Sequence, residues 1–102
     1  MARFAHAWQR MLVVLSDGTL AGFLLMTDQH IDMLFMDPSA IGRGGGALLL
    51  QEAERRGARS LECFHDNHAA RHFYERHGWQ VEREYDRDFA GRSRSFVFYA
   101  KG

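Results

Sequence analysis

The sequence predicts one domain of the α/β class, in which two helices pack against a mixed sheet. Three short apolar runs separated by turn residues fill residues 10–36, a pattern typical of consecutive strands. Two later segments have the apolar periodicity of helices, and the first of them follows a glycine-rich loop. The chain of 102 residues is long enough for one small hydrophobic core.

The first three strands are expected at residues 10–16, 19–26 and 30–36. Asp17-Gly18 between the first two is a strong hairpin signal, because both residues tolerate the left-handed backbone of a tight turn. Asp37-Pro38 ends the third strand, since proline has no N–H to give to a sheet ladder.

Two helices and three further strands complete the prediction. The helices are expected at about residues 45–56 and 68–77, each followed by a glycine that is a natural C-cap. One strand lies between them at residues 60–65, and the last two form a hairpin around Ala90-Gly91. The order is β-β-β-α-β-α-β-β. The helix between the third and fourth strands makes one parallel pair, and the hairpins make the other pairs antiparallel.

The charge balance argues against a general nucleic-acid-binding surface. Thirteen basic and thirteen acidic residues give a formal net charge of zero, whereas such a surface needs a basic excess. Near the C-terminus four arginines are interleaved with acidic residues, and we interpret this segment as a solvated, salt-bridged hairpin rather than an anion site. The arginines are Arg83, Arg87, Arg92 and Arg94.

The single cysteine, Cys63, excludes an internal disulfide and indicates a reducing compartment. It lies in the apolar run LECF, which favours a structural thiol over a nucleophile. No apolar stretch is long enough to span a membrane, and the first ten residues lack the apolar segment of a signal peptide. We therefore expect a cytoplasmic protein that does not bind membranes.

The glycine-rich loop IGRGGGALLL, residues 41–50, opens the first helix. The free N–H groups and the positive dipole end of a helix start favour an anion such as phosphate. A Walker loop is excluded because Ala47-Leu48 follows the last glycine instead of Lys-Ser/Thr. A dinucleotide fingerprint fits Gly42 to Ala47, but the expected ribose-binding acid, Glu62, falls inside a strand. A tight turn that binds nothing is the plain alternative.

Two segments, FMDPSAIGRGGGALL and DNHAARHFYERHGW, resemble the motifs of the GNAT N-acetyltransferases. FMDPSAIGRGGGALL matches the first motif of that family at Pro38, Arg43, Gly44 and Gly46, with Ile41 in place of the usual Gln or Arg. DNHAARHFYERHGW matches the second motif position by position, at Asn67, Ala70, Phe73, Tyr74, Gly78 and Trp79. The resemblance covers roughly residues 11–100 and implies the GNAT-like acyl-CoA N-acyltransferase fold.

The resemblance also implies a site for acetyl-CoA as co-substrate. The residues expected to contact it are Phe35, Met36, Arg43, Gly44, Gly45, Gly46, Ala47, Asn67 and Tyr74. Backbone N–H groups of the loop would hold the pyrophosphate, and the strand near Phe35 and Met36 would pair with the pantetheine. Asn67 has the alternative role of a helix N-cap.

The implied reaction is transfer of an acetyl group to a primary amine by direct attack. Tyr74 is the candidate general acid for the departing thiolate, with a core tyrosine as the alternative. His30 and Asp32 are the candidate bases, since alternate residues of a strand share a face. The histidines near the second helix lack a completing acid or cysteine, so no metal is expected.

Family members usually have another strand and two helices before the first hairpin, and those helices form one wall of the acceptor pocket. We expect both features to be missing here, which leaves the strand at residues 10–16 as an unpaired apolar edge. A homodimer that covers this edge is the favoured prediction, and a monomer with residues 3–9 folded over it is the alternative. A catalytically silent acetyl-CoA-binding or regulatory module is the alternative function.

Overall fold

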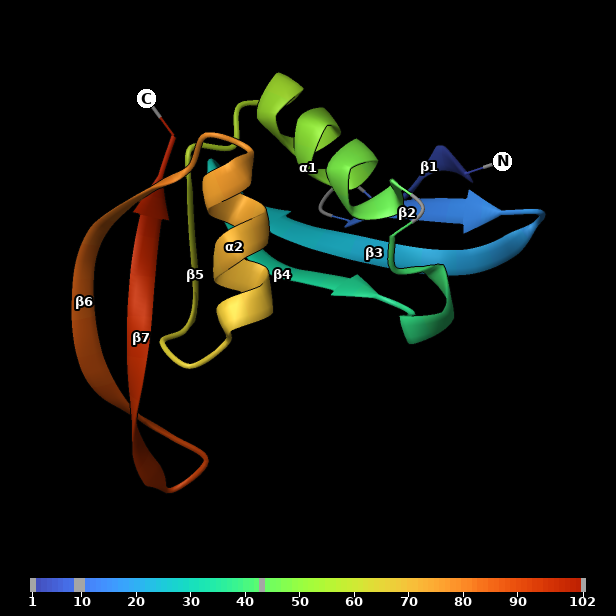
Figure 1. Ribbon diagram of the computed structural model, residues 1–102. Coiled ribbons are helices and arrows are strands. Elements are labelled where there is room, and N and C mark those ends of the chain that lie inside the picture. The colour runs from blue at the N-terminus through green and yellow to red at the C-terminus, as the bar shows by residue number, and fades with distance from the viewer. Residues whose placement is uncertain (1, 9–10, 43, 102) are drawn as a thin grey trace. The chain divides into compact units, whose positions relative to one another are not determined.

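The computed structural model describes residues 2–8, 11–42 and 44–101. The chain divides into two compact units, one ending at Ala58 and the other beginning at Arg59. Figure 1 shows the elements of each unit.

The first unit contains four strands in sequence order, one 3-10 turn and one helix. The strands are β1 (Ala2–Trp8), β2 (Met11–Ser16), β3 (Thr19–Thr27) and β4 (His30–Met36), and each pairs antiparallel with the next. A 3-10 turn, η1 (Pro38–Ala40), and helix α1 (Gly45–Arg55) follow. The predicted Asp17-Gly18 turn is confirmed, since both residues have positive φ, at 54° and 79°.

Strand β1 corrects the prediction that residues 10–16 form an unpaired edge. It pairs with β2 from Ala2 opposite Ser16 to Trp8 opposite Met11. The edge is therefore covered from within the chain, as in the alternative considered above. The strand expected to be missing is present, and only residues 9–10 separate it from β2.

Helix α1 covers one face of this sheet. Leu12, Val14 and Leu24 on that face are almost fully buried, as are Leu49 and Leu50 of the helix. α1 contacts all four strands. The side of the helix that faces them must be apolar, and this requirement accounts for the leucine-rich periodicity of residues 45–56.

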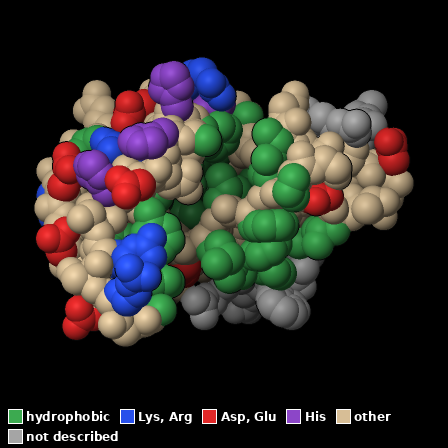
Figure 2. Space-filling view, turned by 60° about the horizontal axis from the view of Figure 1, so that its bottom comes forward, with side chains coloured by type: hydrophobic (Ala, Val, Ile, Leu, Met, Phe, Trp, Pro, Cys, Tyr) green, Lys and Arg blue, Asp and Glu red, His purple; other side chains and the backbone are tan. Residues whose placement is uncertain are grey.

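The opposite face of the same sheet is apolar, and α1, the helix of the described residues of the first unit, does not cover it. Val13, Phe23 and Phe35 follow one another across β2, β3 and β4, and the Phe23 and Phe35 rings stack at 5.4 Å. Met33 is 51% exposed and Phe35 is 47% exposed. Figure 2 shows hydrophobic side chains gathered in one continuous area.

The second unit contains three strands and one helix. They are β5 (Ser60–Phe64), α2 (His68–Arg76), β6 (Gln80–Phe89) and β7 (Arg92–Ala100). β7 lies between β5 and β6 and is antiparallel to both, so the predicted hairpin around Ala90-Gly91 is confirmed.

Helix α2 packs on one face of this second sheet through Tyr99 of β7. The Tyr99 hydroxyl donates to Glu75 at 2.6 Å and accepts from Arg71 at 3.0 Å. The Tyr74 ring lies 5.9 Å from the Tyr99 ring. Leu61 and Val97, on the face of Tyr99, are buried.

Candidate functional site

The glycines before α1 set the backbone conformation of the loop. Gly42 and Gly44 have φ of 90° and 84°, in the left-handed region that favours glycine. A Cβ at either position would meet no atom within 4 Å, so conformation and not crowding explains these two glycines. Arg43, which the first motif includes, lies outside the described residues.

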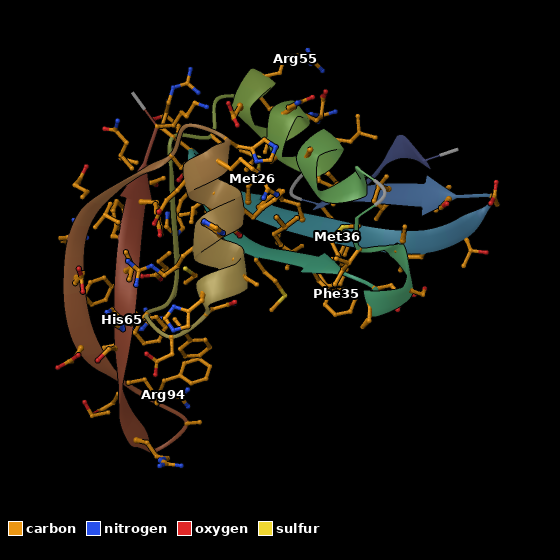
Figure 3. All side chains as sticks on the ribbon, in the orientation of Figure 1. Met26, Phe35, Met36, Arg55, His65 and Arg94 are labelled. Atoms are coloured by element: carbon orange, nitrogen blue, oxygen red, sulfur yellow. The ribbon has the colours of Figure 1, made fainter. Side chains whose placement is uncertain are left out.

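Gly45 has a different role, because it lets the start of α1 approach the end of β4. A Cβ at this position would lie 2.9 Å from Cε of Met36 and 3.5 Å from the Val14 side chain. Gly45 is buried, and Met36 and Phe35 lie close to the loop in Figure 3. Phe35, Met36 and Gly45 are therefore brought together at the C-terminal end of β4, whereas His30 and Asp32 lie at its start.

The N-terminus of α1 has no cap of its own. Leu48 donates the first helical hydrogen bond, to the Gly44 carbonyl at 3.0 Å, so the N–H groups of Gly45, Gly46 and Ala47 have no acceptor within the helix. The N-cap Gly44 has no side chain, and the first turn has no acidic residue. These features fit an anion such as a pyrophosphate, which backbone donors and the helix dipole both favour.

Met36 turns its backbone N–H away from β3. Asp37 donates its N–H to the Ala21 carbonyl at 2.8 Å, which makes Ala21 and Asp37 a hydrogen-bonded pair of the ladder. Hydrogen-bonded and non-bonded pairs alternate in an antiparallel ladder, and Met36 pairs with Gly22 in the next position. The Met36 N–H therefore points to the other edge of β4.

A β-bulge interrupts β4 at the two predicted bases. Leu25 pairs with Met33 and Met26 with Ile31, which leaves Asp32 as the additional residue. Simple alternation does not extend through a bulge, but Thr27 is the cross-strand partner of His30 and also contacts Asp32, which supports the predicted shared face. The Asp32 carboxylate accepts a hydrogen bond from the Thr27 hydroxyl at 2.6 Å.

Asn67 acts as the N-cap of α2, which confirms the structural role considered for it. Its Oδ1 accepts the Ala70 N–H at 3.2 Å. The oxygen is thus used within the helix. A contact of Asn67 with the co-substrate stays a prediction.

Tyr74 lies buried on α2, in ring contact with Phe73 and Tyr99. Burial raises its pKa above the usual value, with smaller contributions from Cys63 and Tyr99. The phenol therefore stays protonated at neutral pH and is able to donate a hydrogen bond.

Cys63 is half-buried in β5, and burial raises the pKa of its thiol to about 11. Only a very small fraction is therefore thiolate at neutral pH, which confirms the interpretation of this cysteine as structural.

A polar hollow at the β6–β7 hairpin was not predicted from the sequence. It has a volume of about 240 Å³ and is lined by His65, Glu84, Tyr85, Asp86 and Ser95. Its groups are paired with one another: His65 lies 3.3 Å from Glu84, and Ser95 donates to Asp86 at 2.6 Å. The lining residues come from β6, β7 and the turn after β5, so no local sequence pattern indicates the hollow.

Comparison with known proteins identifies the family to which this fold and glycine-rich helix start belong. The family model for the acetyltransferase (GNAT) family matches residues 2–79. The chain belongs to the GNAT family of acetyltransferases. Among curated protein sequences, none is significantly similar to this chain.

Solved structures confirm the predicted α/β fold. Apo-form YjaB from Escherichia coli is 27% identical, with a TM-score of 0.79 over 88% of this chain and 63% of that one. A GCN5-related N-acetyltransferase from Rhodopseudomonas palustris is also 27% identical, with a TM-score of 0.70 over 89% of this chain and 59% of that one. The chain spans less than two thirds of the length of both.

A third structure contains the expected co-substrate. A Bacillus anthracis protein assigned as a streptothricin acetyltransferase, in complex with acetyl coenzyme A, is 19% identical. Its TM-score is 0.74, over 87% of this chain and 59% of that one.

Neither helix of the described residues is long and apolar enough to cross a membrane. Within the same residues, no group of three His, Cys, Asp or Glu side chains is arranged to hold a metal ion.

Proposed function

We propose that this chain is an N-acetyltransferase that transfers the acetyl group of acetyl-CoA to a primary amine by direct attack. The uncapped N-terminus of α1 at the end of β4 carries the proposal, because it offers anion-binding N–H groups beside a backbone donor. Membership of the GNAT family supports it. The co-substrate supplies an activated thioester, so the protein needs no nucleophile of its own.

The first unit is proposed to hold acetyl-CoA. The N–H groups of Gly45, Gly46 and Ala47 bind the pyrophosphate, with Arg43 and Gly44 completing the loop. Phe35 and Met36 lie beside the pantetheine, and the Met36 N–H polarises the thioester carbonyl as charge develops on its oxygen. Ile41 is 67% exposed, so replacement of the family's polar residue removes a side-chain contact without disturbing the fold.

The proton transfers are assigned to Tyr74 and to His30 or Asp32. Tyr74 donates to the departing thiolate, a role that its protonated state at neutral pH supports. Asn67 is assigned to the pantetheine or the acceptor through its amide N–H group, since its oxygen caps α2. His30 or Asp32, at the start of β4, accepts the proton of the incoming amine.

One observation favours the alternative function, an acetyl-CoA-binding module without turnover. The two residues between β1 and β2 leave no room there for the two helices that family members place between strand and hairpin. Those helices form part of the acceptor pocket, so binding without turnover is the specific competing outcome.

Release of free coenzyme A in the presence of a panel of amines tests the proposal. We expect amine-dependent thiol release, and we expect Tyr74→Phe to lower kcat by about a hundredfold, because it removes the donor while keeping the ring. An unchanged melting temperature for Tyr74→Phe is the control for folding. Acetyl-CoA binding with no amine-dependent release would favour the binding module, and no binding would exclude both functions.

The homodimer stays a prediction, now supported by a different surface. β1 covers the edge that first suggested it, whereas the sheet face containing Met33 and Phe35 is apolar and exposed. Light scattering at micromolar concentration tests it, and a monomer throughout would exclude it.

A further inference from the structure

The β6–β7 hairpin separates its charges onto two faces. Residues 82–89 read EREYDRDF, and side chains of a strand alternate between faces. Arg83, Tyr85 and Arg87 therefore point to one side of β6, and Glu84, Asp86 and Asp88 to the other. The sequence pattern was interpreted as salt-bridged arginines and acids, and Arg83 does pair with Glu82 at 3.4 Å. From Glu84 to Asp88, however, the acids lie on the face opposite to the arginines.

Residues from β5 and β7 extend the arginine side into a continuous surface. In the strand register, Arg83 lies opposite Phe98, Tyr85 opposite Phe96, Arg87 opposite Arg94, and Phe89 opposite Arg92. Phe96 in turn pairs with Phe64, and Phe98 with Glu62. We call this surface the arginine–aromatic face. Its members are Phe64, Arg83, Tyr85, Arg87, Phe89, Arg92, Arg94, Phe96 and Phe98.

The guanidinium groups of this face lie over its rings. Arg83 is 4.2 Å from the centroid of Phe98, Arg87 is 4.3 Å from that of Phe96, and Arg94 is 4.7 Å from that of Phe64. Figure 3 labels Arg94. Contact with a ring holds each guanidinium in place and leaves its N–H edge for other partners.

Positive charge on this face exceeds negative charge. Two carboxylates contact two of its four arginines: Glu62 lies 3.3 Å from Arg87, and Glu82 lies 3.4 Å from Arg83. Arg87 and Arg94 occupy directly opposite positions, an arrangement of like charges that destabilises a strand pair. Asp66, in the turn after β5, also interacts electrostatically with Arg94, although its carboxylate is hydrogen-bonded to His65.

The arginine–aromatic face is also accessible. α2 packs on the other face of the sheet, against Tyr99. The Arg83 and Arg87 side chains are 58% and 46% exposed, and Phe89 is 45% exposed. Arg92 and Arg94 are exposed as well.

We propose that the arginine–aromatic face is a docking surface for an acidic polypeptide segment, whose carboxylates pair with the ring-held guanidinium groups. We choose an acidic partner because of charge complementarity, since planar guanidinium groups form paired hydrogen bonds with carboxylates. A single-stranded nucleic acid fits less well, since it needs open ring faces for its bases and guanidinium groups cover those of Phe64, Phe96 and Phe98.

Fluorescence anisotropy with a short labelled oligoglutamate peptide tests this surface. We expect the full chain to bind the peptide and Arg87→Gln/Arg94→Gln to weaken binding by about tenfold or more, because two charge-assisted contacts are lost. An oligolysine of the same length should not bind. Arg55→Gln/Arg76→Gln is the matched control, since it removes the same charge from the ends of α1 and α2 and should keep the affinity.

Three outcomes would overturn the proposal. They are no binding of oligoglutamate to the full chain, an equal loss in the control variant, or tighter binding of an oligothymidylate through Arg87 and Arg94. Circular dichroism melts of both double variants show whether each folds. Binding to this face does not depend on acetyl-CoA, so the result is independent of the proposed transferase activity.

Discussion

The two helices of this protein begin in different ways. α2 starts behind Asn67, whose side chain accepts the Ala70 N–H at 3.2 Å. α1 starts behind Gly44, which has no side chain to offer. The first residue of α2, His68, is exposed, whereas the first residue of α1, Gly45, is buried against Met36.

This difference separates a helix start that serves folding from one that is available to a ligand. A side-chain cap satisfies the orphan donors of a helix and stabilises it by about 1 kcal/mol. α1 lacks that stabilisation and keeps its first N–H groups together beside the end of β4. Backbone donors without a competing side chain are what an anion site at a helix start requires.

The same substitution in the two helices gives the largest expected contrast. Ala47 and Ala70 both occupy the third position of their helix. A carboxylate there complements the helix dipole, so Ala47→Glu and Ala70→Glu should each leave stability unchanged or raise it by a few tenths of a kcal/mol. Ala47→Glu should also repel the pyrophosphate and weaken acetyl-CoA binding by about a hundredfold.

Titration calorimetry with acetyl-CoA measures this contrast. Ala47→Gln is the control for bulk, and it should lose much less affinity than Ala47→Glu. Equal losses in Ala47→Glu and Ala70→Glu would show that the two helix starts do not differ in function.

Substitution at the first position of each helix should give the next largest contrast, in the free energy of unfolding. Gly45→Leu should lower the free energy of unfolding by about 2 kcal/mol, because a Cβ would lie 2.9 Å from Met36 Cε and the packed side chain must move. His68→Leu, at the exposed equivalent position of α2, should change it by less than about 0.5 kcal/mol. Urea unfolding measures both, and similar values would mean that α1 does not pack as described.

Removal of the α2 cap should have a smaller effect. Asn67→Ala should lower the free energy of unfolding by about 1 kcal/mol, because the Ala70 N–H loses its acceptor. Asn67→Ser should restore most of it, since serine caps as well. If Asn67→Ala were neutral in thermal melts, the cap would not account for the start of α2.

The last turn of α1 gives the smallest effect and a pH dependence. Glu52 bonds Arg55 and Arg56, and the Arg55 guanidinium first, then Arg56, lower its pKa from 4.5 to about 2. A lowered pKa contributes stability above pH 4.5 that is lost as the pH falls toward 2. Glu52→Gln should therefore cost less than about 1 kcal/mol at pH 7 and progressively less as the pH falls through about 2. A difference that grows on acidification would contradict this sign.

The helices and most strands could be predicted because local signals agreed with tertiary structure. The leucine periodicity after Gly44 placed α1 within one residue of its observed end, Arg55. The same agreement held for the Asp17-Gly18 hairpin. Strand β1 was missed because its ARFAHAW sequence contains three alanines, which strands disfavour, and only pairing with β2 makes it a strand.

The site could be predicted only in part. Motifs indicated which residues surround the helix start, but the direction of the Met36 N–H and the bulge at Asp32 depend on ladder register. The charge separation of β6 was visible in the sequence as strict alternation. The sequence interpretation treated these arginines and acids as one mixed group, but alternate residues of a strand lie on opposite faces.

Binding of acetyl-CoA to the α1 start is the central claim, and a thermal melt with saturating acetyl-CoA, with NAD as control, tests it most directly. At about a hundred times its dissociation constant the ligand should add about 2.7 kcal/mol, which for a small domain raises Tm by roughly 10 °C or more. A rise with acetyl-CoA and none with NAD is the predicted result. No rise with acetyl-CoA, or an equal rise with NAD, would contradict the account.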